Sequence, residues 1–192
     1  MLDDKKVPLL LGGEHTITLG ALQALKEKRK EVSVIQFDAH SDTRDEFFGG
    51  RYMHATVMAR AKEIYPDVFQ AGIRSTEPDF ESKMNRKKVI FAEEVESLGV
   101  EKVISRIVAS TKEKVYLTVD FDVLDSGEMP SVGTPEPGGL HFSEISQILK
   151  GVGAKKEIVG LDFVELCPIP HLHAPDFLAA KLIYLTLGYF LS

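Results

Sequence analysis

Three short motifs, GGEH, DAHSD and DFD, each follow an apolar run of the kind found in buried strands. Between them they contain six side chains that carry an imidazole or a carboxylate: His15, Asp38, His40, Asp42, Asp120 and Asp122. Such groups at the end of a core strand are unfavourable without a partner, because buried charges need compensation. Their types and spacing therefore suggest metal binding, the chemistry that suits such a set best.

Two divalent cations would explain why so many acids lie together. Four carboxylates in one place repel one another and take up protons, and two such ions balance their charge. Carboxylates can also bridge two ions that lie about 3.5–4 Å apart. With oxygen ligands, two imidazoles and no thiolate, the set favours Mn(II), with Co(II), Fe(II) and Zn(II) as alternatives. Each motif alone could be a glycine turn, a solvated strand end or an acidic loop, but their combination favours a site.

The elements that would position these groups alternate between short apolar runs and helical patterns. Six runs are predicted as strands, near 7–11, 32–37, 68–73, 88–91, 115–119 and 157–163. Five segments are predicted as helices, near 17–29, 54–65, 99–109, 143–151 and 175–190. Because the strands are apolar on both faces, we predict a parallel sheet with helices on both sides. The expected fold is a doubly wound α/β domain over residues 1–192.

Four of the predicted strands lead into polar side chains. In an open parallel sheet the carboxyl ends of all strands lie on one edge, where ligands bind. The first, second and fifth strands would bring the six candidate metal ligands to this edge, and the sixth reaches Asp162 and Glu165. The loop at 124–140 is rich in proline and glycine, and a loop of this length in a compact domain is usually functional.

Composition and charge exclude several classes of protein. The chain has 192 residues and a net charge of −6, which argues against a nucleic-acid surface and suits a cationic substrate. Cys167 is the only cysteine, so neither a disulfide framework nor a thiolate cage is expected. The N-terminal run lacks the regions of a signal peptide, and the apolar stretch 177–191 is short and carries Lys181. We expect a cytoplasmic protein without membrane contact.

Three longer segments resemble the signature segments of the ureohydrolases, the arginase and agmatinase family. They are LGGEHTITLGALQA at 11–24, VIQFDAHSD at 34–42 and TVDFDVLDSGEMPSVGTPEPGG at 118–139, in the family's order. The resemblance implies an arginase-like fold of three layers, α/β/α, with a mostly parallel sheet. It also implies a binuclear manganese centre, two Mn²⁺ per chain, that hydrolyses a guanidinium group to urea and an amine.

The resemblance assigns roles to individual residues. One ion would be held by His15, Asp38, Asp42 and Asp120. The other would be held by His40, Asp38, Asp120 and Asp122. Two ions can lower the pKa of water from 15.7 to about 7, so that a hydroxide between them attacks the guanidinium carbon. His54, in GGRYMHATV, resembles the proton-transfer histidine, and Glu165, in GLDFVELCP, resembles the acid that grips the guanidinium.

The identity of the substrate is less specified. The segments GTPEPGGL and GIRS resemble the agmatinase branch, which makes agmatine, cleaved to putrescine and urea, the expected substrate. Arginine, guanidinobutyrate and formiminoglutamate are alternatives. Glu77, which follows Arg74 closely, could meet a distal amine of the substrate. A degenerate relative that binds metal without turnover, or a binuclear hydrolase of amides or phosphoesters, would be a different outcome from the same residues.

The resemblance also bears on the ends of the chain and its assembly. Family members generally begin well before the GGEH strand, so an N-terminally shortened version is expected: a natural variant, a late start or a fragment. The run VPLLL would then be a sheet edge with free backbone groups. The family forms trimers or hexamers, so the resemblance predicts a homo-oligomer.

Overall fold

The computed structural model describes residues 6–191, in which six strands form one parallel sheet. The strands are β1 (Leu9–Leu11), β2 (Ser33–Phe37), β3 (Val68–Ile73), β4 (Val89–Phe91), β5 (Lys114–Asp120) and β6 (Glu157–Val164). Their order in the sheet is β1-β6-β5-β2-β3-β4. The chain thus builds outward from β2 toward β4 and then returns on the other side of β2 with β5. The topological switch point, where ligands bind in such sheets, lies between β2 and β5.

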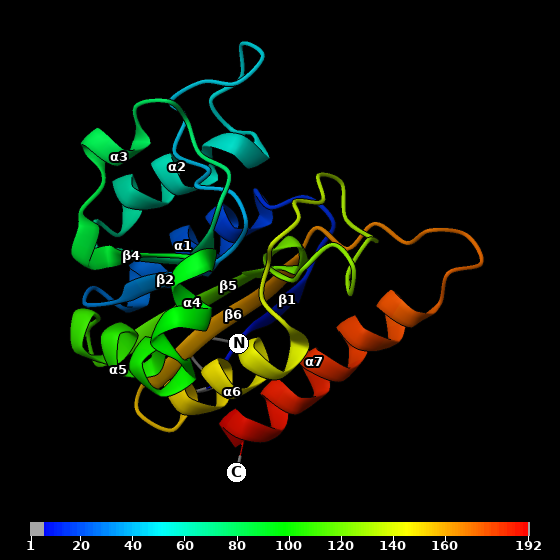
Figure 1. Ribbon diagram of the computed structural model, residues 1–192. Helices are drawn as coiled ribbons and strands as arrows, with labels where there is room; N and C mark the ends of the chain where they lie inside the picture. The colour runs from blue at the N-terminus through cyan, green and yellow to red at the C-terminus, as the bar shows by residue number, and fades with distance from the viewer. Residues whose placement is uncertain (1–5, 192) are drawn as a thin grey trace.

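Helices cover both faces of the sheet and complete three layers (Figure 1). One face packs against α1 (Ile17–Lys28) and α2 (Val57–Ile64). The other packs against α4 (Ala92–Leu98), α5 (Val100–Ser110), α6 (Phe142–Gly153) and α7 (Ala174–Leu191). The short helix α3 (Phe80–Lys83) packs beside β3 and β4. Because both faces are covered, every residue of β2 and β3 is buried, as their mostly apolar sequences require.

The predicted fold, a three-layer α/β/α arrangement around a parallel sheet, is confirmed. All six predicted strands are present within one or two residues of their expected ends. Two short helices, α3 and α4, were not predicted, and the helix expected near 54–65 begins as a 3-10 turn at His54–Thr56. Among the described residues, no helix is long and apolar enough to cross a membrane.

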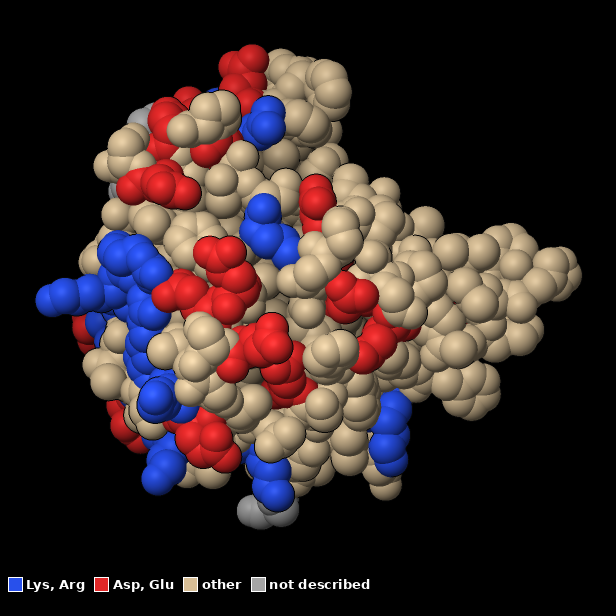
Figure 2. Space-filling view, in the orientation of Figure 1, with Lys and Arg blue, Asp and Glu red and all other residues tan. Residues whose placement is uncertain are grey.

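Two exposed features lie at the side of the sheet where β1 forms the edge. Leu11 in β1 is 63% exposed, in keeping with the expected free edge. The chain between β6 and α7 projects from the molecule, and the projection shows neither acidic nor basic side chains (Figure 2). Residues 166–175 contain no Lys, Arg, Asp or Glu. This part of the surface therefore carries no lysine, arginine or carboxylate side chain, whereas acidic and basic groups are spread over much of the rest.

Gly72 closes the end of β3 against the loop that follows β5, and we predict that alanine cannot replace it. Its φ is 93°, and a Cβ built there would lie 2.5 Å from Val123 Cγ2. Backbone strain and overpacking together should lower the free energy of unfolding of Gly72→Ala by about 2–4 kcal/mol. Gly20→Ala is the matched control, because a Cβ at that site on α1 would lie within 4 Å of no described atom apart from its chain neighbours and the backbone of its own helix. The free energy of unfolding of Gly20→Ala should rise by about 0.5–1 kcal/mol, because alanine is more stable than glycine inside a helix. Equal urea midpoints for the two variants would contradict the prediction.

Candidate active site

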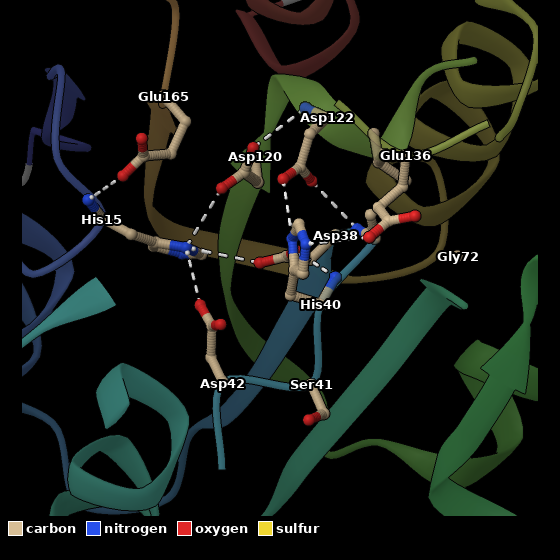
Figure 3. Close-up of polar contacts among 12 residues, drawn as sticks. His15, Asp38, His40, Ser41, Asp42, Gly72, Asp120, Asp122, Glu136 and Glu165 are labelled. Carbon is tan, nitrogen blue, oxygen red and sulfur yellow. Dashed lines mark hydrogen bonds and ion pairs between the residues drawn. The ribbon is translucent and has the colours of Figure 1, made fainter. Parts of the chain in front are cut away.

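The imidazole of His15 faces three carboxylates at the carboxyl edge of the sheet. Its Nδ1 lies 3.3 Å from an oxygen of each of Asp38, Asp42 and Asp120 (Figure 3). His15 is fully buried, and within residues 6–191 this Nδ1 has no hydrogen-bond partner. His15, Asp38 and Asp120 offer ligand atoms within 4.8 Å of one another, close enough to hold a single ion.

A second group lies beside the first and shares Asp38 with it. His40 Nδ1 lies 2.8 Å from Asp122 Oδ2 and 3.6 Å from Asp38 Oδ1. Asp38, His40 and Asp122 again offer ligand atoms within 4.8 Å of one another. The backbone N–H of Ala39 donates to Asp122 Oδ1 at 3.0 Å, which fixes that carboxylate. Two cation sites that share a carboxylate are the arrangement expected of a binuclear centre.

The three strands that lead into these residues, and β6, which leads into Glu165, are neighbours in the sheet. β1, β6, β5 and β2 lie side by side, so residues far apart in sequence meet at one rim. Two residues at this rim, Asp42 and Glu165, have positive φ angles of 52° and 66°. Non-glycine residues adopt this conformation only where the surroundings enforce it, often at functional sites. The carbonyl of Asp42 accepts hydrogen bonds from Met58 and Ala59 at the start of α2, which holds its backbone in place.

Burial and crowding shift the ionisation of the cluster. Burial, with the charges of Asp122 and Asp38, raises the pKa of Asp120 well above its usual range. Burial and the charge of Asp38 raise the pKa of Asp42 to about 7. Burial alone would lower the pKa of His40, but its bonds to Asp122 and Asp38 raise it to about 11. Without a cation the cluster therefore retains protons, which together with the unpartnered Nδ1 of His15 fits a site built for metal.

These shifts predict a pH-dependent uptake of metal. Ligands must be deprotonated to bind, so an ion has to displace protons from Asp42 and His40, whose pKa values are raised to about 7 and about 11. Mn²⁺ affinity should therefore rise with pH from 6 to 8, about tenfold per unit for each proton displaced. Calorimetry in two buffers of different ionisation enthalpy would count the protons released. An affinity independent of pH, with no proton release, would contradict the predicted ligand set.

Glutamine and hydroxyl side chains beneath the cluster orient its members, and the sequence analysis did not identify them. Gln36 donates to Asp38 Oδ2 at 2.6 Å and is itself bonded by Gln70, its neighbour in register on β3. His15 Nε2 lies 2.8 Å from Thr118 Oγ1, so its Nδ1 is left for an ion. Such outer partners fix the ring orientation and tautomer of a metal-binding histidine. A polar residue inside an apolar strand was the available signal.

A cleft of about 420 Å³ opens over the cluster. His40, Asp42, Asp120 and Asp122 lie at its base, and Glu165 and His54 line it with them. Glu165 Oε1 accepts a hydrogen bond from the backbone N–H of His15 at 2.7 Å. A second oxygen of this carboxylate is available for a ligand, because a carboxylate has about four acceptor sites. Burial raises the pKa of Glu165 above its ordinary value.

The structure places His54 and Glu77 farther from the ion sites, on the walls of the cleft. His54 is half-exposed, with Nδ1 3.6 Å from Glu14 Oε1 and its ring edge-on to Phe47. Glu77 also lines the cleft, but its carboxylate accepts from the hydroxyls of Ser41 and Thr43. Glu77 thus supports the loop that carries the ligands, and any contact with a distal substrate amine would compete with these bonds.

Fold and cluster together define a class: doubly wound α/β proteins with a histidine–aspartate cluster for divalent cations at the switch point. The model of the Arginase family matches residues 1–188, and the chain belongs to this family. N(1)-aminopropylagmatine ureohydrolase of Synechocystis is 36% identical over 190 residues, which cover 98% of this chain and 62% of that protein. Agmatinase of Pyrococcus horikoshii is 34% identical over 196 residues, 97% of this chain and 64% of that protein.

A solved structure agrees with these relatives. The crystal structure of agmatine ureohydrolase of Thermoplasma volcanium matches with a TM-score of 0.84 at 34% identity, covering 98% of this chain and 64% of that one. The chain therefore spans less than two thirds of the length of these three relatives. The suspected membership of the arginase and agmatinase family is confirmed.

Proposed function

We propose that this protein is a manganese-dependent hydrolase of a guanidino group, with agmatine, cleaved to putrescine and urea, as its substrate. The observation that carries the proposal is the paired cluster, in which buried imidazoles and carboxylates converge beneath a cleft. Two divalent ions bound there would supply hydroxide at neutral pH. The donor set of oxygen and imidazole groups without thiolate favours Mn(II). Membership of the Arginase family supports the same chemistry.

The remaining residues of the cleft would bind the substrate and move protons. Glu165 would accept paired hydrogen bonds from the planar guanidinium, the geometry in which carboxylates bind such groups most strongly. This contact would hold the guanidinium carbon over the cluster. His54 would deliver a proton to the departing amine, a role that typically contributes about 10²–10⁴-fold to the rate. Its ring on the wall of the cleft is partly open to solvent and can exchange protons there.

Agmatine is proposed ahead of other guanidines because two of the compared proteins are named for activity on agmatine itself. Another is named for N(1)-aminopropylagmatine, a longer guanidine. The far wall of the cleft carries both signs of charge, since Arg44 Nε lies 3.7 Å from Glu77 Oε1. Such a wall could meet either an amine or a carboxylate at the distal end of a substrate. Arginine, guanidinobutyrate and formiminoglutamate, which carry a carboxylate, therefore belong in the same assay.

The decisive experiment measures metal content and urea release in one preparation. Purified protein loaded with Mn²⁺ should bind two ions per chain and release urea from agmatine faster than from the other guanidines. Bound metal without urea from any guanidine would favour a degenerate metal-binding relative. Activity on an amide or phosphoester instead would favour a different binuclear hydrolase. We further propose that the protein is a homo-oligomer in the cytoplasm, a proposal supported by its resemblance to the family and by a composition with a single cysteine, which suits a reducing compartment.

A further inference from the structure

Arg74, just after β3, lies among the backbone carbonyls of a loop that belongs to another strand. Its Nη2 donates to the carbonyls of Asp122 at 2.7 Å and Glu136 at 2.8 Å. Further contacts of the guanidinium reach the carbonyls of Gly72, Val123, Leu124 and Pro137, at 3.1–3.4 Å. Arginine has five donors in a rigid fork and stays charged, so it can hold several carbonyls at once.

This one side chain ties both ends of the loop after β5 to the sheet. Asp122 and Leu124 lie where the loop leaves η4 (Phe121–Val123), and Glu136 and Pro137 lie where it returns. The packing is close, because a Cβ on Gly139 would lie 2.7 Å from Arg74 Nη2. Such a Cβ would also lie 2.5 Å from the backbone N of Asp125 and the backbone C of Leu124, and these backbone contacts explain the glycine.

A carboxylate completes the closure from inside the loop. Asp125 Oδ1 accepts from the N–H of Gly127 at 2.8 Å. Its Oδ2 accepts from the N–H groups of Gly138 and Gly139, at 2.8 and 3.1 Å. Arg74 thus satisfies the carbonyls of the loop and Asp125 its N–H groups, so a long segment rich in proline and glycine is held in one conformation.

The loop carries two parts of the site. At its start, Asp122 belongs to the second ion group with Asp38 and His40. Near its end, Gly133 and Thr134 line the cleft, and Glu136 Oε1 lies 3.9 Å from His40 Nε2. The hydrogen bond from Arg74 to the carbonyl of Asp122 holds the backbone of a predicted metal ligand in place. The bonds to the carbonyls of Glu136 and Pro137 hold the part of the loop that forms a wall of the cleft.

We propose that Arg74 is a positioning residue that holds Asp122 and the adjoining cleft wall in place for the second ion and for the substrate. The predicted effect of Arg74 on turnover rests on the proposed function. The predicted effects of Arg74 on metal binding and on the loop do not depend on which reaction the protein catalyses. The first ion group consists of His15, Asp38 and Asp120. The hydrogen bonds of Arg74 described above go to none of these three residues, so metal binding by this group should depend little on Arg74.

The test compares Arg74→Lys and Arg74→Gln with a matched control, Arg106→Lys. Arg106 also donates to two backbone carbonyls, those of Arg86 and Val89, at 2.6 and 2.7 Å, and it does not line the cleft. Titration of the metal-free proteins with Mn²⁺ should show one of the two Kd values raised about 10–100-fold in both Arg74 variants, as for other residues behind metal ligands. The other Kd should change less than threefold, and Arg106→Lys should match the wild type.

Two further readouts distinguish positioning from general destabilisation. At the same concentration of added Mn²⁺, the wild type should show the exchange-coupled EPR signal of a manganese pair. The Arg74 variants should show mainly the signal of a single Mn²⁺ ion. Hydrogen exchange at Gly127, Gly138 and Gly139, which requires neither metal nor turnover, should accelerate in the Arg74 variants alone. Two intact ion sites with wild-type exchange rates in Arg74→Lys would overturn the inference, as would a wild-type chain that binds fewer than two ions. If the wild type bound two ions but hydrolysed no guanidine, the proposed function would be wrong, and the comparison of the Arg74 variants would remain a valid test of the inference.

Discussion

Asp38→Asn should abolish binding of both ions and lower urea release by at least about 10³-fold, because the several kcal/mol that metal contributes to the transition state would be lost. In the part of the chain that the structure describes, Asp38 offers a ligand atom to both ion groups. Asparagine has nearly the same shape but lacks the negative charge, and its amide would meet the donor Nε2 of Gln36, which lies 2.6 Å from Asp38 Oδ2. Metal analysis after gel filtration and a urea assay would measure the two effects.

Asp67→Asn provides the matched control for this change. Asp67 precedes β3 at the opposite end of the sheet, where its Oδ1 accepts from Lys88 Nζ at 2.6 Å. The same substitution there should leave metal content and turnover as in the wild type and cost only a little stability, because a partly exposed pair contributes about 1 kcal/mol or less. If Asp38→Asn retained two ions per chain and full activity, Asp38 would not belong to the ligand set.

The ends of the strands could be predicted because the sequence changes character sharply there. VIQF is apolar except for Gln36 and is followed at once by DAHSD, and VYLTV is followed by DFD. A buried strand cannot contain such groups without compensation, so both the strand and the site follow from the same residues. The convergence of these ends at one edge follows from parallel topology, which the alternation of strands and helices indicates.

The parts that were not predicted depend on which strands become neighbours. Gln36 and Gln70 are each a single polar residue in an apolar run, and only the register of β2 on β3 pairs them. Arg74 belongs to a recognisable motif, but its partners in the loop after β5 lie 48–63 residues further along the chain. The helix α4, AEEVESL, has too few apolar positions to show a helical period, and it is capped by Glu94, which accepts from the N–H of Phe91. Local patterns do not contain the partners of Gln36, Gln70 and Arg74, and for α4 the cap alone was a local signal.

Glu165→Gln should lower kcat/KM for agmatine by about 10²–10³-fold while leaving two ions bound, because Glu165 belongs to neither ion group. Removing one partner of a buried charge pair typically costs about 2–5 kcal/mol. Glutamine keeps the shape and an acceptor for the N–H of His15, at 2.7 Å in the wild type, but it cannot match two guanidinium N–H groups. Steady-state urea release and metal analysis on the same sample would measure both quantities.

Glu157→Gln is the matched control, since Glu157 begins β6 and Glu165 directly follows it. Glu157 is exposed, and its carboxylate lies 3.9 Å from Lys114 Nζ, so its loss should not affect kcat/KM. The pH profile adds a second criterion. Burial raises the pKa of Glu165, and substrate binding requires the ionised form, so the wild-type kcat/KM should fall as the pH drops toward that raised pKa. With Mn²⁺ kept saturating at every pH, so that metal uptake adds no limb of its own, this limb should be absent from Glu165→Gln. If the substitution changed neither the rate nor the profile, no guanidinium would be bound at this carboxylate, and the cluster would serve a hydrolase of amides or phosphoesters instead.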